Sequence, residues 1–465
     1  MIARDLREWI SQLEKDGDLI RIKEELKLEP DIGALGKATC DIQGPAILAE
    51  NIEGYETPVA MGLHAAFRRC GMAMGLPKDA SFRDIKNKWR TTFDKYPMKS
   101  KIVSTGPCKE NIMLGDDVNL FQFPVPRINI NDASFYFTKT MCVTKDPDSD
   151  WVNMGMYRAM ILDRNRTGIV MQHFQQGAAH YFRSRKLGKP LEMAIVYGAA
   201  PHLPLVSGAP IPWHWNEFDF AGALRGEPEE LVMCETINVP VPATAELVLE
   251  GELREPAIFE GPFGEFAGSY STAYMTPTFH IKAITYRNNP IMDHLYIGRG
   301  RTETDYMTDL PTISSIEQEI IPRHPEVTEI AFLTPKWLNC VVQGKWTHRS
   351  QPLKVMAAIW GARSLINPKM VTLVDEDIDP WNADEVMWAI GARVQADSDI
   401  YTVPGSYASL DPSQSLDGLS CMFGINATKS ILPKPRHNLV EYVTPRKETA
   451  MWKDRITKWM QGGGI

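Results

Sequence analysis

The middle of the chain carries a succession of short β-type segments, and this pattern limits the possible folds more than any other feature of the sequence. The segments are rich in β-branched and aromatic residues, and Gly, Pro and Asn separate them. Many short strands at this spacing are typical of an antiparallel barrel or sandwich. The segments are residues 135–143, 157–162, 168–172, 193–197, 246–249, 279–286 and 291–297.

Segments of α/β type lie on both sides of this β-rich part. The N-terminal part begins with one apolar helical face, followed by the alternating segment 19–23 and by a helix that Ser81 and Asp84 are expected to cap. The C-terminal part contains the apolar segment 370–374, which is typical of a buried strand, and a helix with Asn382 as its N-cap. The residues of the first helical face are Leu6, Trp9, Ile10 and Leu13.

A chain of 465 residues is too long for one compact core, so several domains are expected. The pattern predicts an α+β multidomain protein with an α/β domain at 1–115, a β-rich domain at 116–308, an α/β domain at 309–432 and a C-terminal arm or helix at 433–465. The arm is rich in proline and charge, which favours packing on another subunit.

Composition excludes several classes of protein. The formal charge is -8 and no basic stripe occurs, which argues against nucleic-acid binding. No segment approaches the ~18 uninterrupted apolar residues that a membrane span needs. The N-terminus is charged from its fourth residue, and the seven cysteines are scattered without a CxxC pair. These features predict a cytoplasmic protein with reduced, mostly buried thiols.

The segment 260–265, Glu-Gly-Pro-Phe-Gly-Glu, is the first candidate for chemistry. Two side chains five residues apart on a regular strand point to opposite faces, but the glycines and the proline interrupt that geometry. Two carboxylates that face one cavity repel each other, so one holds a proton while the other stays ionised, as acid–base catalysis requires. Considered alone, a surface turn with two solvated glutamates is the simpler interpretation.

Other candidates lie earlier in the chain. Arg158 ends the segment 153–158 and offers a fork of donors for a carboxylate or phosphate. Asn153, His173 and Glu217 provide oxygen and nitrogen ligands that suit Mn²⁺ or Mg²⁺ better than a thiolate-binding metal. Considered alone, the segment 153–158 is more simply a polar strand end and His173 a hydrogen-bonded structural residue, whereas Glu217, an acid inside an aromatic stretch, suggests a partner. The sequence contains no P-loop, no GxGxxG after a strand, no GxSxG and no HExxH.

Together these segments resemble the UbiD-like decarboxylase family, and especially its branch that handles aromatic and hydroxybenzoate-type acids. The resemblance covers most of the chain, and the order of its motifs makes chance similarity improbable. The most specific matches are 153–158, His173, 217–222, 241–251, 260–265 and 374–380.

The resemblance implies a cofactor and a site. Such enzymes bind prenylated FMN, whose phosphate is held through Mn²⁺ (or Mg²⁺) with K⁺ nearby. The implied fold places a split β-barrel of flavin-reductase type, which binds the flavin, between an N-terminal α/β domain and a C-terminal α/β oligomerisation domain. The implied metal ligands are Asn153, His173 and Glu217, the implied Glu–Arg–Glu catalytic set is Arg158, Glu260 and Glu265, and the further implied cofactor contacts are Met156, Tyr157, Gln172 and Lys369.

The resemblance also implies the reaction, which is reversible, non-oxidative decarboxylation of an aromatic or heteroaromatic, α,β-unsaturated acid. Loss of CO₂ from an sp² carbon leaves a carbanion that no side chain can delocalise, so a cofactor must act as electron sink. In the implied mechanism the substrate forms a covalent adduct with the flavin, and Glu265 delivers the proton. A flavin prenyltransferase supplies the cofactor, and the enzyme is expected to be a homodimer or hexamer.

The substrate stays open at this level. His294, Arg299 and Arg301 fall near the expected pocket, and an extra arginine there would bind a second anionic group, as on an aromatic dicarboxylate or an aryl-CoA acid. A salt bridge from Arg299 or Arg301 to Glu303 or Asp305 is an equally good explanation. A metal-dependent hydrolase without flavin is the alternative from another class, and a non-catalytic assembly subunit is a third possibility.

Overall fold

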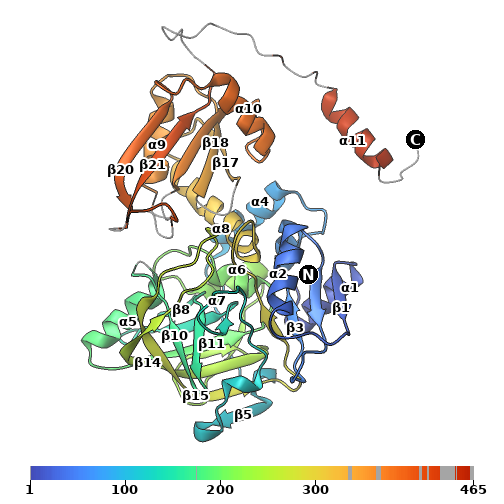
Figure 1. Cartoon of the computed structure of the whole chain (residues 1–465), viewed down its shortest axis with the longest axis vertical. Helices are drawn as coiled ribbons and strands as arrows, with labels where there is room; N and C mark the ends of the chain where they lie inside the picture. The colour runs from blue at the N-terminus through green and yellow to red at the C-terminus, as the bar shows by residue number, and fades with distance from the viewer. Residues whose placement is uncertain are drawn as a thin grey trace.

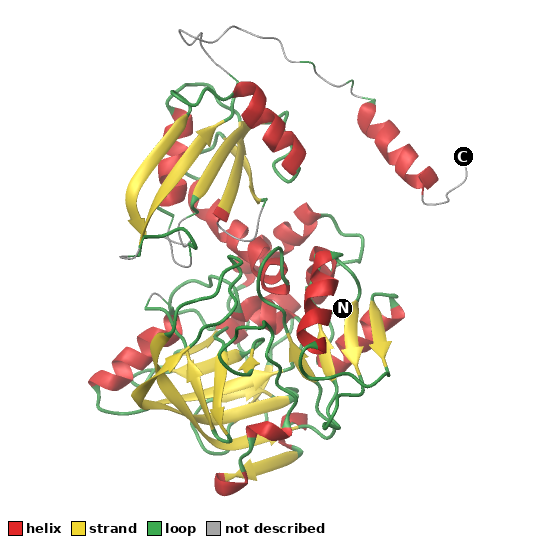
Figure 2. Ribbon diagram, in the orientation of Figure 1, coloured by secondary structure: helices red, strands yellow, loops and turns green. Residues whose placement is uncertain are grey.

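A computed structural model describes residues 2–460, apart from 174, 334–337, 363–367, 408–410, 416–417, 430–442, 444–445 and 447. Three parts follow one another in Figure 1: an N-terminal unit in blue, a central β-rich unit in green, and a C-terminal unit in orange. Helices α4 and α8 lie where the three units meet (Figures 1 and 2). The α+β multidomain class expected from the sequence is confirmed.

The N-terminal unit is a four-stranded sheet with helices. Its strand order is β1-β2-β3-β16, so a strand from residue 292 onward joins an N-terminal sheet. The predicted apolar face of α1 is buried, and Ser81 with Asp84 forms the predicted capping box of α4. The elements are α1 (Leu6–Lys15), β1 (Leu19–Ile22), α2 (Asp31–Asp41), β2 (Ala46–Ala49), β3 (Val59–Met61), α3 (Phe67–Ala73), α4 (Phe82–Thr92) and β16 (Met292–His294).

The central unit is built on a nine-stranded antiparallel sheet. Its pairing order is β6-β9-β10-β15-β14-β11-β7-β8, with β5 beside β15, so the sheet is open rather than a closed barrel. The predicted strand 135–143 divides into two, because its two halves pair with different neighbours. The strands are β5 (Asn111–Leu114), β6 (Tyr136–Phe137), β7 (Met141–Lys145), β8 (Val152–Gly155), β9 (Ala159–Asp163), β10 (Arg166–Ile169), β11 (Leu191–Tyr197), β14 (Leu247–Glu260) and β15 (Tyr274–Tyr286).

Helices and a small second sheet flank the central sheet. Helix α5 packs along β7, β8 and β11, and α7 packs against β8. The three-stranded sheet has the order β13-β12-β4. These elements are α5 (Gln176–Lys186), α6 (His202–Ser207), α7 (Glu217–Arg225), β4 (Lys101–Ile102), β12 (Glu230–Met233) and β13 (Pro240–Pro242); 3-10 turns occur at Phe93–Lys95, Pro107–Lys109, Gly115–Asp117 and Leu120–Gln122.

The C-terminal unit is a five-stranded sheet covered on both faces. Helices α8 and α9 bury one face, and α10, with Asn382 as its N-cap, buries the other. The predicted arm, 433–465, lies mostly outside the described residues, apart from α11. The elements are α8 (Glu303–Ile320), β17 (Val327–Phe332), β18 (Asn339–Gly344), α9 (Gln351–Trp360), β19 (Met370–Asp375), α10 (Ala383–Arg393), β20 (Ile400–Tyr407), β21 (Leu419–Asn426) and α11 (Thr449–Met460).

A buried ion cluster joins the units at the start of α8. Lys139 Nζ donates to Asp293 at 2.9 Å and to Glu303 at 2.7 Å, and all three side chains are fully buried. Glu303 also accepts the backbone N–H groups of Gly62 and His64 from the N-terminal unit. Because an unpaired buried charge is costly, this cluster fixes the N-terminal unit, the central sheet and α8 relative to one another.

The seven cysteines carry no disulfide, as predicted, and most are buried. Among the helices that the structure describes, none is both long and apolar enough to cross a bilayer.

Candidate active site

Arg158 and the two glutamates of the segment 260–265 form one ion-paired cluster, here named the Glu–Arg–Glu cluster. Arg158 lies between β8 and β9, Glu260 ends β14, and Glu265 lies in the following turn. Arg158 Nε and Nη2 donate to the two carboxylate oxygens of Glu260, each at 2.8 Å, and Nη1 donates to Glu265 Oε1. The two glutamates therefore converge on one guanidinium.

The turn between the glutamates explains this convergence. Gly261 has φ +102°, a conformation that disfavours other residues, and a Cβ there would lie 3.0 Å from a backbone carbonyl oxygen. The N–H of Gly264 donates to Asp132 Oδ1 at 2.8 Å, and the N–H of Glu265 donates to the Ser269 carbonyl at 2.9 Å. These bonds end the alternation of the strand, so both carboxylates reach Arg158.

Burial makes the two carboxylates of the cluster different. The Glu260 side chain is fully buried and uses both oxygens, whereas Glu265 keeps 8% of its side chain exposed. Burial opposes the charge of Arg158, but the hydrogen bonds and charges of the glutamates outweigh it and raise the pKa of Arg158. The guanidinium also lies 4.8 Å from the ring of Phe263. Such a cluster can hold one carboxylate as a fixed anion while the other exchanges a proton.

Three residues at the cluster were not identified from the sequence. Ser271 Oγ accepts from Arg158 Nη2 at 3.3 Å, Asp132 holds the turn, and the ring of Tyr136 lies 4.5 Å from that of Phe263. No motif marks any of them. The pairing of β6 with β9 and the turn after β14 bring these residues close to Arg158. Local sequence patterns could therefore not identify them.

Asn153 and Glu217, two of the three expected metal ligands, lie close together. Glu217 begins α7, and its Oε2 accepts the N–H of Met154 on β8 at 2.9 Å. Burial raises the pKa of Glu217 to about 8, and among the described residues the buried Nδ2 of Asn153 has no hydrogen-bond partner. A fully buried carboxylate close to the side-chain amide of Asn153 fits a site for a hard divalent cation, because such a cation prefers oxygen ligands and would compensate the buried negative charge.

His173, the third expected ligand, is exposed and stacks on Phe182 with ring centroids 5.2 Å apart. Among the described residues, no hydrogen bond joins His173 to Asn153 or Glu217, and no cluster of three His, Cys, Asp or Glu side chains with metal-binding geometry occurs.

The other expected cofactor contacts are distributed over two units. Tyr157 Oη accepts the N–H of Gly177 at 3.3 Å, and burial raises the pKa of Tyr157. The backbone N–H of Met156 donates to the Ser207 carbonyl at 3.1 Å, and that of Gln172 donates to the Gln175 side chain at 2.6 Å. Lys369 lies in the C-terminal unit instead, where its ammonium donates to Asp411 at 2.9 Å and to Ser413.

Of the three residues expected at the substrate pocket, two have structural partners. His294 is fully buried between Tyr197 Oη and the Pro124 carbonyl, and burial lowers its pKa to about 3. Arg301 pairs with Asp309 and donates to the Phe332 carbonyl at 2.9 Å.

Arg299 differs from these two. It is exposed, and a Cβ on Gly268 would lie 3.2 Å from its Cγ, so its side chain passes over the turn that carries Glu265.

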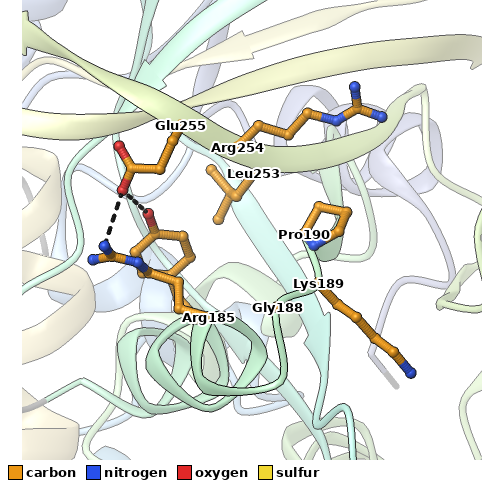
Figure 3. Close-up of a pocket in the computed structure, with 8 residues that line it drawn as sticks. Arg185, Gly188, Lys189, Pro190, Leu253, Arg254 and Glu255 are labelled. Carbon is orange, nitrogen blue, oxygen red and sulfur yellow. Dashed lines mark hydrogen bonds and ion pairs between the residues drawn. The ribbon is translucent and has the colours of Figure 1, made fainter.

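A separate surface cavity of about 450 Å³ lies between α5 and β14. Figure 3 shows Glu255 accepting from Tyr181 and pairing with Arg185 at this cavity. None of its lining residues belongs to the Glu–Arg–Glu cluster, so this cavity and the candidate active site are distinct.

Comparison with known families gives the class of protein. Three domain models of 3-octaprenyl-4-hydroxybenzoate carboxy-lyase match the chain: the N-terminal model at 10–89, the Rift-related model at 101–300 and the C-terminal model at 305–427. The protein is therefore an enzyme of the carboxy-lyase class. Its sequence is 33% identical to the phenolic acid decarboxylases of Sedimentibacter hydroxybenzoicus and Bacillus subtilis, over 99% of this chain and 98% and 100% of theirs.

Solved structures agree with this assignment. The open form of vanillic acid decarboxylase from Sedimentibacter hydroxybenzoicus superposes with a TM-score of 0.88 at 32% identity, covering 99% of this chain and all of that one. The UbiD-class enzyme HmfF from Pelotomaculum thermopropionicum, in complex with FMN, gives 0.85 at 29% identity and covers 96% of this chain and 98% of its own. The chain belongs to the UbiD family, which confirms the resemblance seen in the sequence.

Proposed function

We propose that this protein catalyses reversible, non-oxidative decarboxylation of an aromatic or heteroaromatic, α,β-unsaturated carboxylic acid with prenylated FMN as cofactor. The observation that carries the proposal is the Glu–Arg–Glu cluster, which combines one arginine with two unequal carboxylates. Relatives named phenolic acid decarboxylase, and HmfF structures with FMN and with prFMN, support the substrate class and the cofactor.

The cofactor and its metal would be held on one side of the central sheet. Asn153, His173 and Glu217 would bind Mn²⁺ or Mg²⁺, with K⁺ nearby, after the His173 side chain leaves its stack on Phe182. Met156, Tyr157 and Gln172 would contact the flavin. Lys369 would reach the phosphate only after giving up its contact with Asp411. We also assign to the open central sheet, within residues 116–308, the flavin-binding role of a split β-barrel.

The residues of this chain would manage placement and protons. Prenylated FMN, when bound, would supply the electron sink for the electron pair that stays on the substrate carbon as CO₂ leaves. Arg158 orients the substrate carboxylate and keeps both glutamates close to it. Both oxygens of Glu260 accept from Arg158, and we assign to Glu265, the more exposed of the two carboxylates, the role of holding and delivering the proton at its carboxylate oxygen.

Glu265→Gln tests this assignment. The variant and Glu192→Gln, a control whose carboxylate accepts a backbone N–H from Asn238, are co-expressed with a flavin prenyltransferase. Exchange of ¹³C-bicarbonate is then measured over a set of aromatic acids. We expect Glu265→Gln to keep its flavin absorbance and lose about 10²–10⁴-fold in exchange rate, while the control exchanges normally. Wild-type exchange by Glu265→Gln would remove Glu265 from its role. Colourless protein that hydrolyses esters or amides would favour the flavin-free hydrolase instead.

A second candidate concerns the substrate. An aromatic dicarboxylate or aryl-CoA acid would bring a second anionic group, and the exposed Arg299 beside the Glu265 turn favours this possibility. Arg301 is less suited, because Asp309 and a backbone carbonyl already engage it.

Assembly is the last part of the proposal. A flavin prenyltransferase would supply the cofactor, and the enzyme would be a homodimer or hexamer assembled through residues 309–432 and the arm at 433–465. Light scattering of the purified protein tests the number of subunits.

A further inference from the structure

Tyr136 is a fully buried tyrosine on β6 that packs with Phe263, a residue of the turn between the two glutamates. Its backbone pairs with Met160 on β9, two residues after Arg158, so the register of the sheet aligns Tyr136 with the strand that follows the arginine. Its ring lies 4.5 Å from that of Phe263, which itself lies beneath the Arg158 guanidinium. The ring is thus fixed between the sheet and the turn of the glutamates.

The hydroxyl of Tyr136 is a polar group on a side chain that lies in a buried hydrophobic cluster. It is buried, and it has no hydrogen-bond partner within bonding distance among the described residues. Burial raises the pKa of Tyr136, and the negative charge of Glu260 raises it further. A buried hydroxyl without a partner loses about 1–3 kcal/mol unless a nearby group accepts from it, and Glu260 is the acceptor that this hydroxyl faces.

We propose that Tyr136 is a positioning residue that donates its hydroxyl hydrogen to the Glu260 carboxylate and so leaves Glu265 as the member of the pair that carries the proton. This inference rests on the proposed function, and it concerns a residue that the sequence motifs do not include.

The hydrogen-bonding capacity of Glu260 allows this bond. An ionised carboxylate accepts at about four lone-pair sites, and the two bonds from Arg158 occupy only two of them. A third donor further stabilises the ionised form of Glu260. Glu265 accepts from the same guanidinium and is the more exposed of the two side chains.

The charged groups around Glu260 come from three elements. Arg158 donates to it from the β8–β9 connection, Glu265 accepts from the same guanidinium in the turn after β14, and Asp132, from the segment before β6, holds that turn through the N–H of Gly264. Removal of the Tyr136 hydroxyl alone changes none of these charges, so its effect on the titration of Glu260 can be measured separately.

Tyr136→Phe is the test, because it deletes only the hydroxyl. Tyr181→Phe is the matched control: it removes a tyrosine hydroxyl that bonds Glu255 at 3.1 Å, outside the cluster. In the flavin-loaded enzyme, we expect the acidic limb of the kcat/KM profile to move up by about one pH unit in Tyr136→Phe, with flavin content unchanged. The control should keep the wild-type profile. An unshifted limb in Tyr136→Phe would overturn the proposal.

A second measurement separates this inference from the proposed function. The metal-free, flavin-free protein is labelled with [δ-¹³C]glutamate, and the Glu260 resonance is identified by its absence in Glu260→Gln. We expect its titration midpoint to rise by about one pH unit in Tyr136→Phe and to stay unchanged in Tyr181→Phe. An equal midpoint in wild type and Tyr136→Phe contradicts the positioning role. If the Glu260 midpoint shifts but the protein decarboxylates no aromatic acid, the positioning role of Tyr136 is supported and the proposed decarboxylase function is rejected.

Discussion

Arg158 binds both carboxylate oxygens of Glu260 through Nε and Nη2, at 2.8 Å each, although 102 residues separate the two in sequence. This two-point contact fixes the plane of the carboxylate as well as its position. Glu265 accepts from Nη1 of the same guanidinium and, unlike the fully buried Glu260, keeps 8% of its side chain exposed. The two glutamates should therefore contribute unequally to stability as well as to catalysis.

Glu260→Gln should destabilise the fold more than Glu265→Gln. Loss of the fully buried partner of a buried arginine costs about 3–5 kcal/mol, whereas loss of one hydrogen bond to a charged group costs about 1.5–3 kcal/mol. Urea unfolding of the cofactor-free variants, followed by tryptophan fluorescence, measures the difference. Equal midpoints for the two variants would show that the two-point contact adds no stability.

Asp18 should make stability depend on pH in the acidic range. It accepts from Arg68 at 2.7 Å and from the fully buried Arg69 at 3.0 Å. Burial disfavours the Asp18 charge, but the two arginines outweigh it and lower the pKa of Asp18. Because its pKa is lowered by folding, Asp18 stabilises the fold at pH values above its unfolded pKa of about 4. This stabilisation is lost as pH falls through the folded pKa.

Asp18→Asn should therefore be less stable than wild type at pH 7, by about 3 kcal/mol, and should lose less stability between pH 5 and pH 3, a range chosen around that unfolded pKa of about 4. Asp41→Asn is the control, because Asp41 pairs with Lys37 on an exposed helical face. Unfolding free energies at several pH values provide the comparison. Parallel pH profiles for wild type and Asp18→Asn would contradict the assignment.

Glu217→Gln should weaken metal binding without damage to the fold. The glutamine oxygen can still accept the N–H of Met154, but the buried negative charge is gone. We expect Mn²⁺ affinity to fall by at least about tenfold, while the metal-free protein unfolds at the same urea concentration or higher, because an uncompensated buried carboxylate has been removed. Metal content is measured by elemental analysis after dialysis against Mn²⁺.

Glu250→Gln is the control for that experiment. Glu250 is also fully buried and accepts two backbone N–H groups, those of Glu235 and Thr236, yet it lies outside the proposed metal site. The Glu250→Gln variant should therefore bind Mn²⁺ as the wild-type protein does. Full retention by Glu217→Gln would exclude Glu217 as a ligand.

Arg299→Leu and Arg301→Leu should have different effects. If Arg299 binds a second anionic group, Arg299→Leu raises KM for aromatic diacids by about 10–100-fold, which corresponds to one charged hydrogen bond, and leaves KM for monoacids unchanged. Arg301→Leu should mainly lower stability, because it removes the contacts with Asp309 and Phe332. Identical KM changes for mono- and diacids in Arg299→Leu would reject the second anionic group.

Short-range features were predictable from the sequence alone. The buried face of α1, the capping box of Ser81 and Asp84 and the N-cap at Asn382 all follow from residues within seven positions of one another. The order of the motifs also predicted the family correctly, because each motif keeps its own local spacing. The same sequence suggested Arg158, Glu260 and Glu265 as a set, but their contact could only be inferred by resemblance.

Tertiary structure decided which long-range partners each residue has. The pattern of residues 292–294 indicates a strand, yet only folding pairs β16 with β3 of the N-terminal sheet. The sequence suggested that His294 and Arg301 contact the substrate. In the structure His294 is buried and bonded to the Pro124 carbonyl, and Arg301 pairs with Asp309. The position of Tyr136 beside Glu260 likewise depends on the register of β6 against β9. Caps and amphipathic faces are set by neighbours along the chain, whereas sheet register and ion pairs over a hundred residues depend on how the whole core packs.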